Sequence, residues 1–311
     1  MSILHQVPSE AKIKREIKRI VFGKHLFCPY CGSRSIKKYG KRYRCKRCRK
    51  PFSLTSVCWL KWMKISLQAF WLLLWCWQKK IAIDQAKGLS GLSEITVRRW
   101  YEKFRKHLPK KKLIDTRLSG DIQMDEAYRK VRKKDKAYSI IAAKEKAKKG
   151  KRKRIALSFQ AKNSVNRGEA IDFLAKYVKP ESNLFTDGAG IYRKIENWWK
   201  VNHQYERHNK WEFALTSEIE GLFGNLFTFI RRMYHHVTRE KLPQILIEFW
   251  MRFSYPEYFS SPYDYLEAAL LPLKRKEIIS QRKFRKKFSQ PREAEIPFIF
   301  WQKSLTSVPI C

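Results

Sequence analysis

Two pairs of cysteines limit what this chain can fold into more than any other feature. Each pair has the spacing Cys-x-x-Cys, and thirteen residues separate the two pairs. Such pairs are typical of a zinc ribbon, in which two tight turns each supply two thiolates to one tetrahedral zinc ion. Gly32 and Gly40 suit turns of this kind. A redox dithiol or a pair of disulfides is the alternative interpretation. The four residues are Cys28, Cys31, Cys45 and Cys48.

The charge of the chain indicates the kind of partner. Its 311 residues include 68 Lys and Arg but only 28 Asp and Glu, a formal net charge of +40. An excess of this size favours a polyanion, and DNA or RNA before a membrane surface. Nine of the basic residues lie between Lys37 and Lys50, with no acid among them. The ribbon is therefore expected to face nucleic acid and to hold one structural zinc ion.

Hydropathy and cysteine usage predict the compartment. The N-terminus is polar and charged, which is unlike a signal peptide. The most apolar run, Ala69–Trp77, has nine residues, whereas a spanning helix needs about 20. Seven cysteines, four of them in metal spacing, fit a reducing cytosol. We expect a cytoplasmic protein associated with the nucleoid.

Helical patterns flank the ribbon. Residues 9–22 predict a short amphipathic helix capped by Ser9, and Ser66–Gln78 predicts an apolar one. A short helix over Ile81–Leu89, ending at Gly88 and Gly91, precedes a basic helix over Glu94–His107.

A short helix, a glycine-containing turn and a basic helix make a candidate helix-turn-helix. An ordinary helical linker with a solvated basic face is the alternative. The cations expected on the polar face are Arg98, Arg99, Lys103, Arg105 and Lys106, the first four as DNA contacts.

Beyond a linker at Lys110–Lys112 the pattern changes from the period of a helix to that of a strand. A helix pattern over Asn166–Tyr177 follows the third strand-like run, and two further helices are expected over 215–238 and Pro243–Phe253. The strand-like runs are Asp121–Tyr128, Ala137–Ala143, Ile155–Gln160 and Asn183–Thr186.

Two further segments are strongly basic. Residues 129–154 hold 14 Lys and Arg with two acids, in two clusters that read as exposed hairpin turns. Such turns either follow a phosphate backbone or are simply solvated. The tail, 274–287, holds eight Lys and Arg with one acid, and is either a DNA-binding arm or a disordered segment.

Three carboxylates stand out because acids are scarce. Asp125 and Asp187 each end a predicted strand, and Glu220 lies early on the long helix. Carboxylates that converge in this way can hold two Mg²⁺ or Mn²⁺ ions, and two metals can clamp the oxygens of a phosphodiester displacement. Each acid alone is weak evidence, since a strand-end Asp is more often a turn residue and Glu218 lies beside Glu220.

Several motifs occur in a characteristic order, and with them the chain resembles bacterial insertion-sequence transposases that join a zinc ribbon to a DDE nuclease domain. The similarity runs from about Ser9 to Leu273. The resemblance implies Mg²⁺-dependent DNA strand cleavage and transfer at terminal inverted repeats, insertion into target DNA, and a homodimer or higher oligomer on DNA. The motifs are Cys28-Pro-Tyr-Cys31, Tyr43-Arg-Cys-Lys-Arg-Cys48 running on to Phe52, Met124-Asp-Glu-Ala-Tyr128, Thr186-Asp-Gly188 with Tyr192, Val201-Asn-His203, Ile219-Glu-Gly221 and Tyr234-His-His-Val237.

The resemblance assigns the catalytic acids and also shows two departures. The acids would be Asp125, Asp187 and Glu220, separated by 62 and 33 residues, with Asp125 bridging both ions. Many relatives have Asn where this chain has Ser217, and Lys where it has Phe227. Glu220, Phe227 and Arg231 share one face of a helix. We therefore expect Arg231 or Arg232 to contact the DNA end instead.

The expected fold is α+β or α/β and multidomain. It comprises a zinc ribbon, a helix-turn-helix-like region and, as the resemblance implies, an RNase H-like core with C-terminal helices. Two alternative functions are a catalytically inactive, transposase-derived DNA-binding protein and a structure-specific nuclease on the same core. His203, His235 and His236 are either structural or in contact with the site. The expected modules are 1–24, 25–60 (ribbon), 61–112 (helix-turn-helix), 113–273 (catalytic) and 274–311 (tail).

Overall fold

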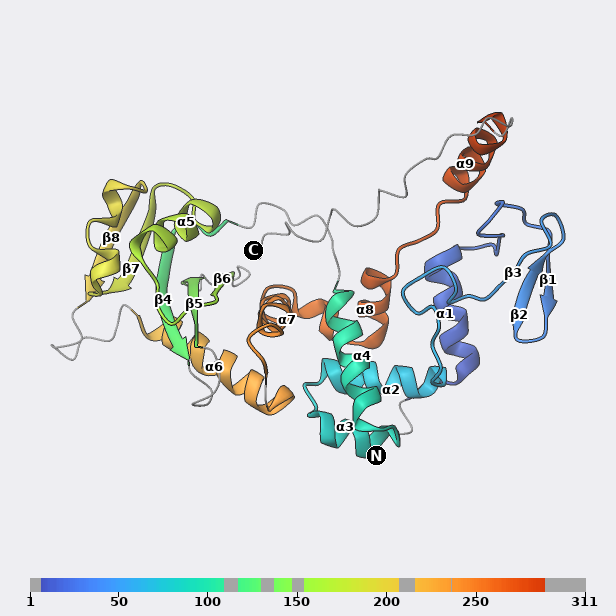
Figure 1. Ribbon diagram of the computed structural model, residues 1–311, viewed down its shortest axis with the longest axis horizontal. Coiled ribbons are helices and arrows are strands. Elements are labelled where there is room, and N and C mark those ends of the chain that lie inside the picture. Colours follow the sequence, from blue (N-terminus) through green and yellow to red (C-terminus); the bar gives the residue numbers. More distant parts are fainter. Residues whose placement is uncertain are drawn as a thin grey trace. The chain divides into compact units, whose positions relative to one another are not determined.

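The structure is a computed structural model that describes residues 7–108, 117–129, 137–146, 154–206, 216–235 and 237–288. It forms two compact units (Figure 1). One comprises Met1–Gln78 with Ser260–Val308, and the other Lys79–Phe259 with Pro309–Cys311. The linker at Lys110–Lys112, most of the two basic clusters, His236 and residues 289–311 lie outside the described residues.

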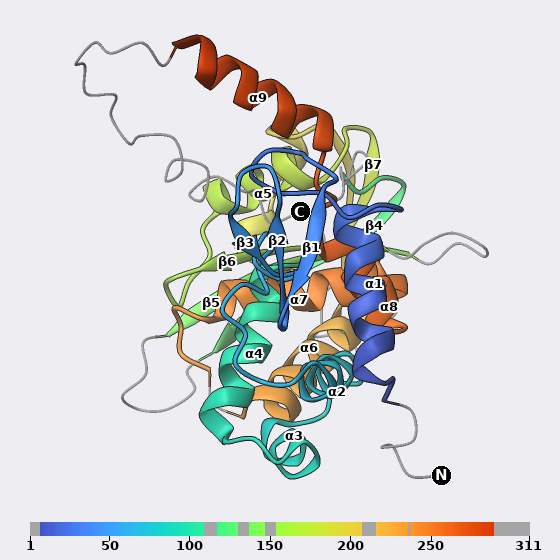
Figure 2. The ribbon, with the colours of Figure 1, turned by 90° about the vertical axis from the view of Figure 1, so that its right-hand side faces the viewer.

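Helices α1, α2 and α8 form the helical part of the first unit. Helix α1 (Glu10–Phe22) begins at Ser9, whose side chain accepts a hydrogen bond from the backbone N–H of Lys12. It packs against α2 (Leu67–Gln78) and α8 (Pro262–Ala269), as Figure 2 shows for α1 and α8. Helix α2 is apolar on nearly all sides, which suits a helix that its neighbours cover. Both helices predicted in this part of the chain are confirmed.

The ribbon of the same unit is a small antiparallel sheet of β1 (Ile36–Tyr39), β2 (Arg42–Cys45) and β3 (Pro51–Phe52). The basic tail is helical over α9 (Arg275–Phe288), where we expected an arm or a disordered segment. Arg275 Nε donates a hydrogen bond to the carbonyl oxygen of Gly32, 2.7 Å away. The start of the tail is therefore joined to the ribbon.

The second unit contains a five-stranded sheet. Its order is β6-β5-β4-β7-β8, in which β4, β5 and β6 are antiparallel neighbours and β4, β7 and β8 run parallel. All four predicted strands are confirmed, although β4 continues four residues past Asp125. The strands are β4 (Asp121–Arg129), β5 (Tyr138–Glu145), β6 (Ile155–Gln160), β7 (Ser182–Asp187) and β8 (Val201–Glu206).

Helices cover both faces of this sheet. Helix α5 (Arg167–Tyr177) buries Phe173 and Leu174 in one core with Ile122 and Met124 of β4. Helix α6 (Ser217–Tyr234) contacts β4 and β5 on the other face, and α7 (Leu242–Ser254) contacts β6 and α6 (Figure 1). Short 3₁₀ turns lie between β7 and β8, at Gly190–Tyr192 and Ile195–Asn197, and after α7, at Pro256–Phe259.

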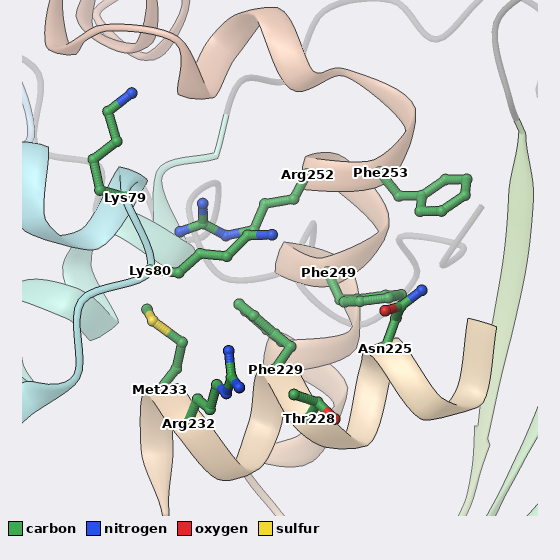
Figure 3. Close-up of a pocket in the computed structure, with 10 residues that line it drawn as sticks. All are labelled: Lys79, Lys80, Asn225, Thr228, Phe229, Arg232, Met233, Phe249, Arg252 and Phe253. Atoms are coloured by element: carbon green, nitrogen blue, oxygen red, sulfur yellow. The ribbon is translucent and has the colours of Figure 1, made fainter. Parts of the chain in front are cut away.

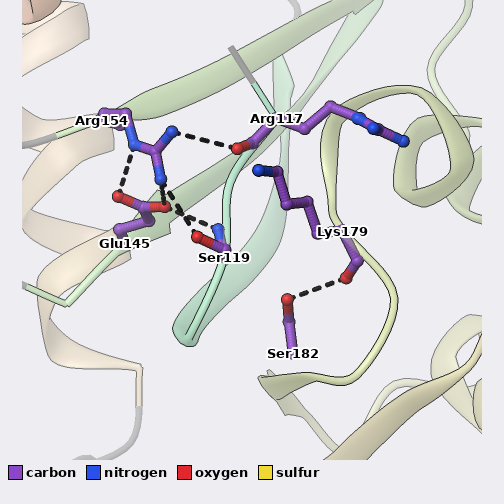
Figure 4. A network of polar contacts seen from close by, with 6 residues as sticks. All are labelled: Arg117, Ser119, Glu145, Arg154, Lys179 and Ser182. Carbon is purple, nitrogen blue, oxygen red and sulfur yellow. Dashed lines mark hydrogen bonds and ion pairs between the residues drawn. The ribbon is translucent and has the colours of Figure 1, made fainter. Parts of the chain in front are cut away.

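A polar network fixes the sheet at the end where β4 begins (Figure 4). The Arg154 guanidinium pairs with Glu145 and donates to Ser119 Oγ at 3.2 Å and to the Arg117 carbonyl oxygen at 3.1 Å. The backbone N–H of Ser119 in turn donates to Glu145 Oε1 at 2.6 Å. One arginine thus ties together the segments that open β4, close β5 and open β6.

Helices α3 (Ile83–Ser90) and α4 (Glu94–Lys106) pack together in the second unit, whereas α2 belongs to the first. Helix α3 continues through Gly88 and ends at Gly91, where φ of +65° favours glycine. Ser93 caps α4 as predicted, because its side chain accepts from the backbone N–H of Thr96.

In the parts of the chain that the structure describes, no helix combines the length and apolar character that crossing a membrane requires.

Candidate functional site

The four ribbon cysteines form one cluster. Their sulfur atoms all lie within 4.8 Å of one another. The Sγ atoms of Cys28 and Cys48 are 3.5 Å apart and those of Cys31 and Cys45 are 3.6 Å apart. Zinc–sulfur bonds of 2.3 Å in a tetrahedron place two sulfurs about 3.8 Å apart. The four cysteines are free thiols, which excludes disulfides among them. The donor set therefore fits a closed structural zinc site.

Asp125 and Asp187 lie at equivalent positions just beyond the paired part of two adjacent parallel strands. The paired positions of β4 and β7 end with Gln123 opposite Phe185, and each aspartate lies two residues further on. Side chains two residues apart on a strand share a face. Both aspartates therefore belong to the face of the sheet that α6 covers.

Helix α6 brings Glu220 to the same face. The buried side chain of Gln123 accepts a hydrogen bond through Oε1 from the backbone N–H of Ile219, 2.8 Å away. The residue that caps α6, Thr216, makes no side-chain cap hydrogen bond, so Gln123 caps the helix from the sheet. Lys144 of β5 adds an ion pair to Glu218, with Nζ 2.8 Å from Oε2. Two strand residues thus hold the first turn of α6, where Glu220 lies.

The electrostatics show that the acids influence one another. Burial, with a smaller contribution from the charges of Glu126, Asp187 and Glu220, raises the pKa of Asp125 to about 7. Among the described residues, only the cysteines bring three or more ligand atoms within 4.8 Å of one another. The oxygens of the three carboxylates are therefore not all that close together. A divalent cation among these oxygens would remove the mutual repulsion. The donor set fits Mg²⁺ or Mn²⁺ in its chemistry.

A fourth acid, Glu126, was not among the predicted site residues. It accepts hydrogen bonds from the hydroxyls of Tyr192 and Tyr128, the latter at 3.1 Å. Burial raises the pKa of Glu126, and the charge of Asp187 contributes to the increase. Tyr192 follows the turn after Asp187, so its bond to Glu126 joins the two aspartate-bearing segments. The dipeptide Asp125-Glu126 was the signal available in the sequence.

Arg129 places a cation on the same strand and the same face of the sheet as Asp125. It lies four residues after Asp125 on β4, and its guanidinium carbon is 4.0 Å from the centre of the Phe227 ring. Phe227 in turn stacks on Phe223, with ring centres 6.1 Å apart. Phe227 therefore serves as a platform for an arginine from the sheet. Arg231 and Arg232 are exposed on α6, and their contact with the DNA end stays a prediction.

The predicted cations of α4 divide into two groups. Arg98 and Arg99 are exposed, Arg98 pairs with Glu94 at 2.6 Å, and Lys103 Nζ lies 4.6 Å from the Trp100 ring centre. The expected position of Arg105 on the polar face is wrong. Its side chain is 8% exposed and faces Glu248 of α7, because it lies on the side of α4 that packs against α7.

His203 is buried within the sheet. Its Nε2 lies 2.9 Å from Thr186 Oγ1 and its Nδ1 lies 3.3 Å from Glu196 Oε2. Burial lowers the pKa of His203, although Glu196 opposes the shift. These contacts brace β8 against β7 beside Asp187. His235 is exposed at the end of α6.

Comparisons with known proteins identify the class. Residues 117–254 match the family model of the ISXO2-like transposase domain. The chain therefore carries an insertion-sequence transposase domain, which confirms the resemblance, and a transposase-type role in DNA processing follows. The match spans β4 through α7 and includes all three predicted catalytic acids.

Two other comparisons add little. No curated protein matches the chain. Among solved structures, a chain in the cryo-electron microscopy structure of the simian T-cell lymphotropic virus intasome in complex with PP2A regulatory subunit B56 gamma is similar. It has 12% sequence identity and a TM-score of 0.32, over 58% of this chain and 67% of that chain. A TM-score this low carries no argument.

Proposed function

We propose that this protein is a DNA transposase that binds the terminal inverted repeats of an insertion sequence and catalyses strand cleavage and strand transfer. The observation that carries the proposal is the placement of Asp125, Asp187 and Glu220. Two lie on adjacent parallel strands, each two residues beyond the last paired positions, and the third is on a helix tied to one of these strands by Gln123. The sheet order β6-β5-β4-β7-β8, with helices on both faces, supports an RNase H-like core.

Each acid has a proposed role in this site. The charges of Asp187 and Glu220 both act on Asp125, which suits a carboxylate that would be shared by two Mg²⁺ or Mn²⁺ ions. Asp187 and Glu220 would each supply a further ligand to one of the two ions. Two such ions, when bound, activate the attacking oxygen and stabilise the leaving oxygen of a phosphodiester. The protein's own contribution is to hold the oxygens in place and to position the strand. No side chain is assigned as a covalent nucleophile.

Basic surfaces would bring DNA to these acids. The ribbon and α4 carry cations that suit recognition of the repeats; on α4 these are the exposed Arg98 and Arg99 and the half-buried Lys103. Arg129, Arg231 and Arg232 suit contacts nearer the acids. The ribbon's zinc is structural, since all four positions are thiolates. Two DNA ends must be joined to one target, so we propose a dimer or higher oligomer on DNA.

The decisive test uses DNA from both sides of the coding region as substrate. Purified protein with Mg²⁺ should cleave it at defined ends and join those ends to target DNA. Asp125→Asn should bind the same DNA with unchanged affinity and neither cleave nor join it. Equal activity of the variant would refute the catalytic assignment.

Two other outcomes would favour other functions. Specific binding without cleavage by the wild-type protein, in Mg²⁺ and in Mn²⁺, would indicate an inactive descendant that retains DNA binding. Preference for branched over linear terminal-repeat DNA would indicate a structure-specific nuclease.

A further inference from the structure

A cationic pocket lies in the second unit, apart from the acids. Helices α6 and α7 form most of its wall, and Lys79 and Lys80, which precede α3, complete it (Figure 3). Its volume is about 580 Å³, within the range of sites for small organic ligands. That volume admits a single nucleotide but not a double helix.

The charges of the pocket are of one sign. Its basic residues are Lys79, Lys80, Arg232 and Arg252, and none of the described lining residues is acidic. Burial lowers the pKa of Lys80 and the nearby charge of Arg252 lowers it further, while the charge of Glu248 opposes the shift. A bound anion would relieve this repulsion.

A buried network behind the pocket does not neutralise it. Glu248 is fully buried and accepts from Arg252 Nε at 2.8 Å and from the Tyr234 hydroxyl at 2.6 Å. Arg105 Nη1 lies 3.7 Å from the same carboxylate. One carboxylate thus serves two guanidiniums. This arrangement orients Arg252 and leaves a net positive charge beneath the pocket.

The remaining lining suits a nucleobase. The rings of Phe229 and Phe249 lie with centres 5.6 Å apart, and those of Phe249 and Phe253 lie 6.4 Å apart. Aromatic faces bind bases by stacking and tolerate any base. Asn225 and Thr228 add an amide and a hydroxyl, which can hydrogen-bond a base edge. Figure 3 shows these side chains on the same helix face as Phe229 and Arg232.

We propose that this pocket binds one unpaired nucleotide of the DNA substrate. The base would stack on the phenylalanines, and the phosphate would pair with Lys80 and Arg232. The position along α6 supports this. Asn225 and Arg232 lie five and twelve residues after Glu220, or about 8 and 18 Å along the helix axis. A DNA strand covers that span in roughly two to five nucleotides. The inference rests on the proposed function, because it takes DNA as the ligand.

The first experiment measures binding of dAMP to the full-length protein by calorimetry, without added Mg²⁺, so that cleavage plays no part. Arg232→Gln should weaken dAMP binding by at least about tenfold. The matched control is Lys176→Gln, since Lys176 is an exposed cation of α5 that has no proposed DNA contact and does not line the pocket. It should change dAMP affinity less than about twofold. Equal effects of the two variants, or no dAMP binding by the wild type, would overturn the proposal.

A second variant and a second ligand series complete the test. Phe253→Ala, at a partly exposed position, should weaken dAMP binding and leave the weaker binding of inorganic phosphate unchanged. A duplex with one unpaired adenine should bind more tightly than the fully paired duplex, and dAMP should remove that difference. If dAMP binds but both duplexes bind equally, the pocket serves a free nucleotide and the proposed DNA role is wrong. None of these readouts depends on catalysis. The nucleotide pocket can therefore be refuted while the proposed transposase activity stands, and the transposase activity can be refuted while the pocket still binds a nucleotide.

Discussion

The side-chain oxygen of Gln123 lies 2.8 Å from the backbone nitrogen of Ile219, so that a strand residue caps the helix that carries Glu220. Gln123 is two residues before Asp125 on the same face of β4. This side chain therefore helps to set the position of Glu220 relative to Asp125, together with the ion pair of Lys144 and Glu218. The two acids are 95 residues apart in the chain, and the hydrogen bond relates the strand that carries one to the helix that carries the other.

Replacing Gln123 by Leu should separate a positioning role from a purely structural one. Loss of a buried hydrogen bond costs about 1–3 kcal/mol of unfolding free energy, so the variant should fold. Strand cleavage should fall by about tenfold or more, and the Mn²⁺ concentration needed for half-maximal activity should rise. Gln160→Leu, in β6, is the control. A variant with lower stability but the wild-type Mn²⁺ requirement would contradict a positioning role.

The pH dependence of stability should reveal Asp125. Its pKa is raised from 3.8 to about 7, so the folded state binds a proton more tightly than the unfolded state. The stability that protonated Asp125 contributes is fully present below pH 4 and is lost as pH rises toward 7. At about 1.4 kcal/mol per pKa unit, the metal-free loss should be on the order of 2–4 kcal/mol. Thermal denaturation of wild type and Asp125→Asn across this window measures it.

Two results would complete that comparison. Asp125→Asn should lose less stability over the same window, and Mg²⁺ should stabilise the wild type more at pH 8 than at pH 5. Parallel curves for wild type and variant would show that Asp125 is ionised throughout the range.

Because Arg129 stacks on Phe227, we predict that a positive charge placed at position 227 on the helix can replace the one at position 129 on the strand. Arg129→Ala should weaken binding to terminal-repeat DNA by about threefold to tenfold, because one phosphate contact is lost, and should reduce the salt dependence of binding. Adding Phe227→Lys to Arg129→Ala should restore much of the affinity. The control is Lys176→Ala, on α5 across the sheet. Failure of the double variant to recover, with both proteins folded, would show that the position of the charge is not interchangeable.

The zinc ribbon predicts one zinc ion per chain in protein purified without chelator. Cys45→Ser should lower the zinc content and weaken DNA binding, because the basic strands β1 and β2 are held by the cluster. Cys58→Ser, a cysteine outside the cluster, should retain one zinc. Metal analysis that finds no zinc in the wild type would contradict the assignment.

Much of this architecture could be predicted from local sequence patterns. Helix α1 follows from Ser9 and the buried stripe at Ile13, Ile17 and Val21, and β6 has the predicted bounds. The metal cluster follows from cysteine spacing alone. These features depend on residues close together in the chain, so that periodicity and capping preferences are sufficient to find them.

Features that depend on distant partners could not be predicted in this way. Strand β8 has the polar sequence of an edge strand, with Val201 as its main buried residue, and gives no clear alternation. From the sequence, Arg105 looks like any other surface cation, and only the packing of α7 against α4 shows that it faces Glu248. The roles of Gln123 and Arg129 depend on contacts with α6, about 100 residues away. Each is an ordinary strand residue in the sequence, and only the packing of α6 shows its partner.

The central claim is that Asp187, with Asp125 and Glu220, binds the catalytic metal, and a change of metal preference tests it most directly. Asp187→Cys replaces a carboxylate by a softer thiolate ligand, which accepts Mn²⁺ better than Mg²⁺. We predict no cleavage of terminal-repeat DNA by this variant in Mg²⁺ and recovered cleavage in Mn²⁺, while Asp172→Cys on the exposed side of α5 behaves as wild type in both. Wild-type cleavage by Asp187→Cys in Mg²⁺ would contradict the assignment of the metal site.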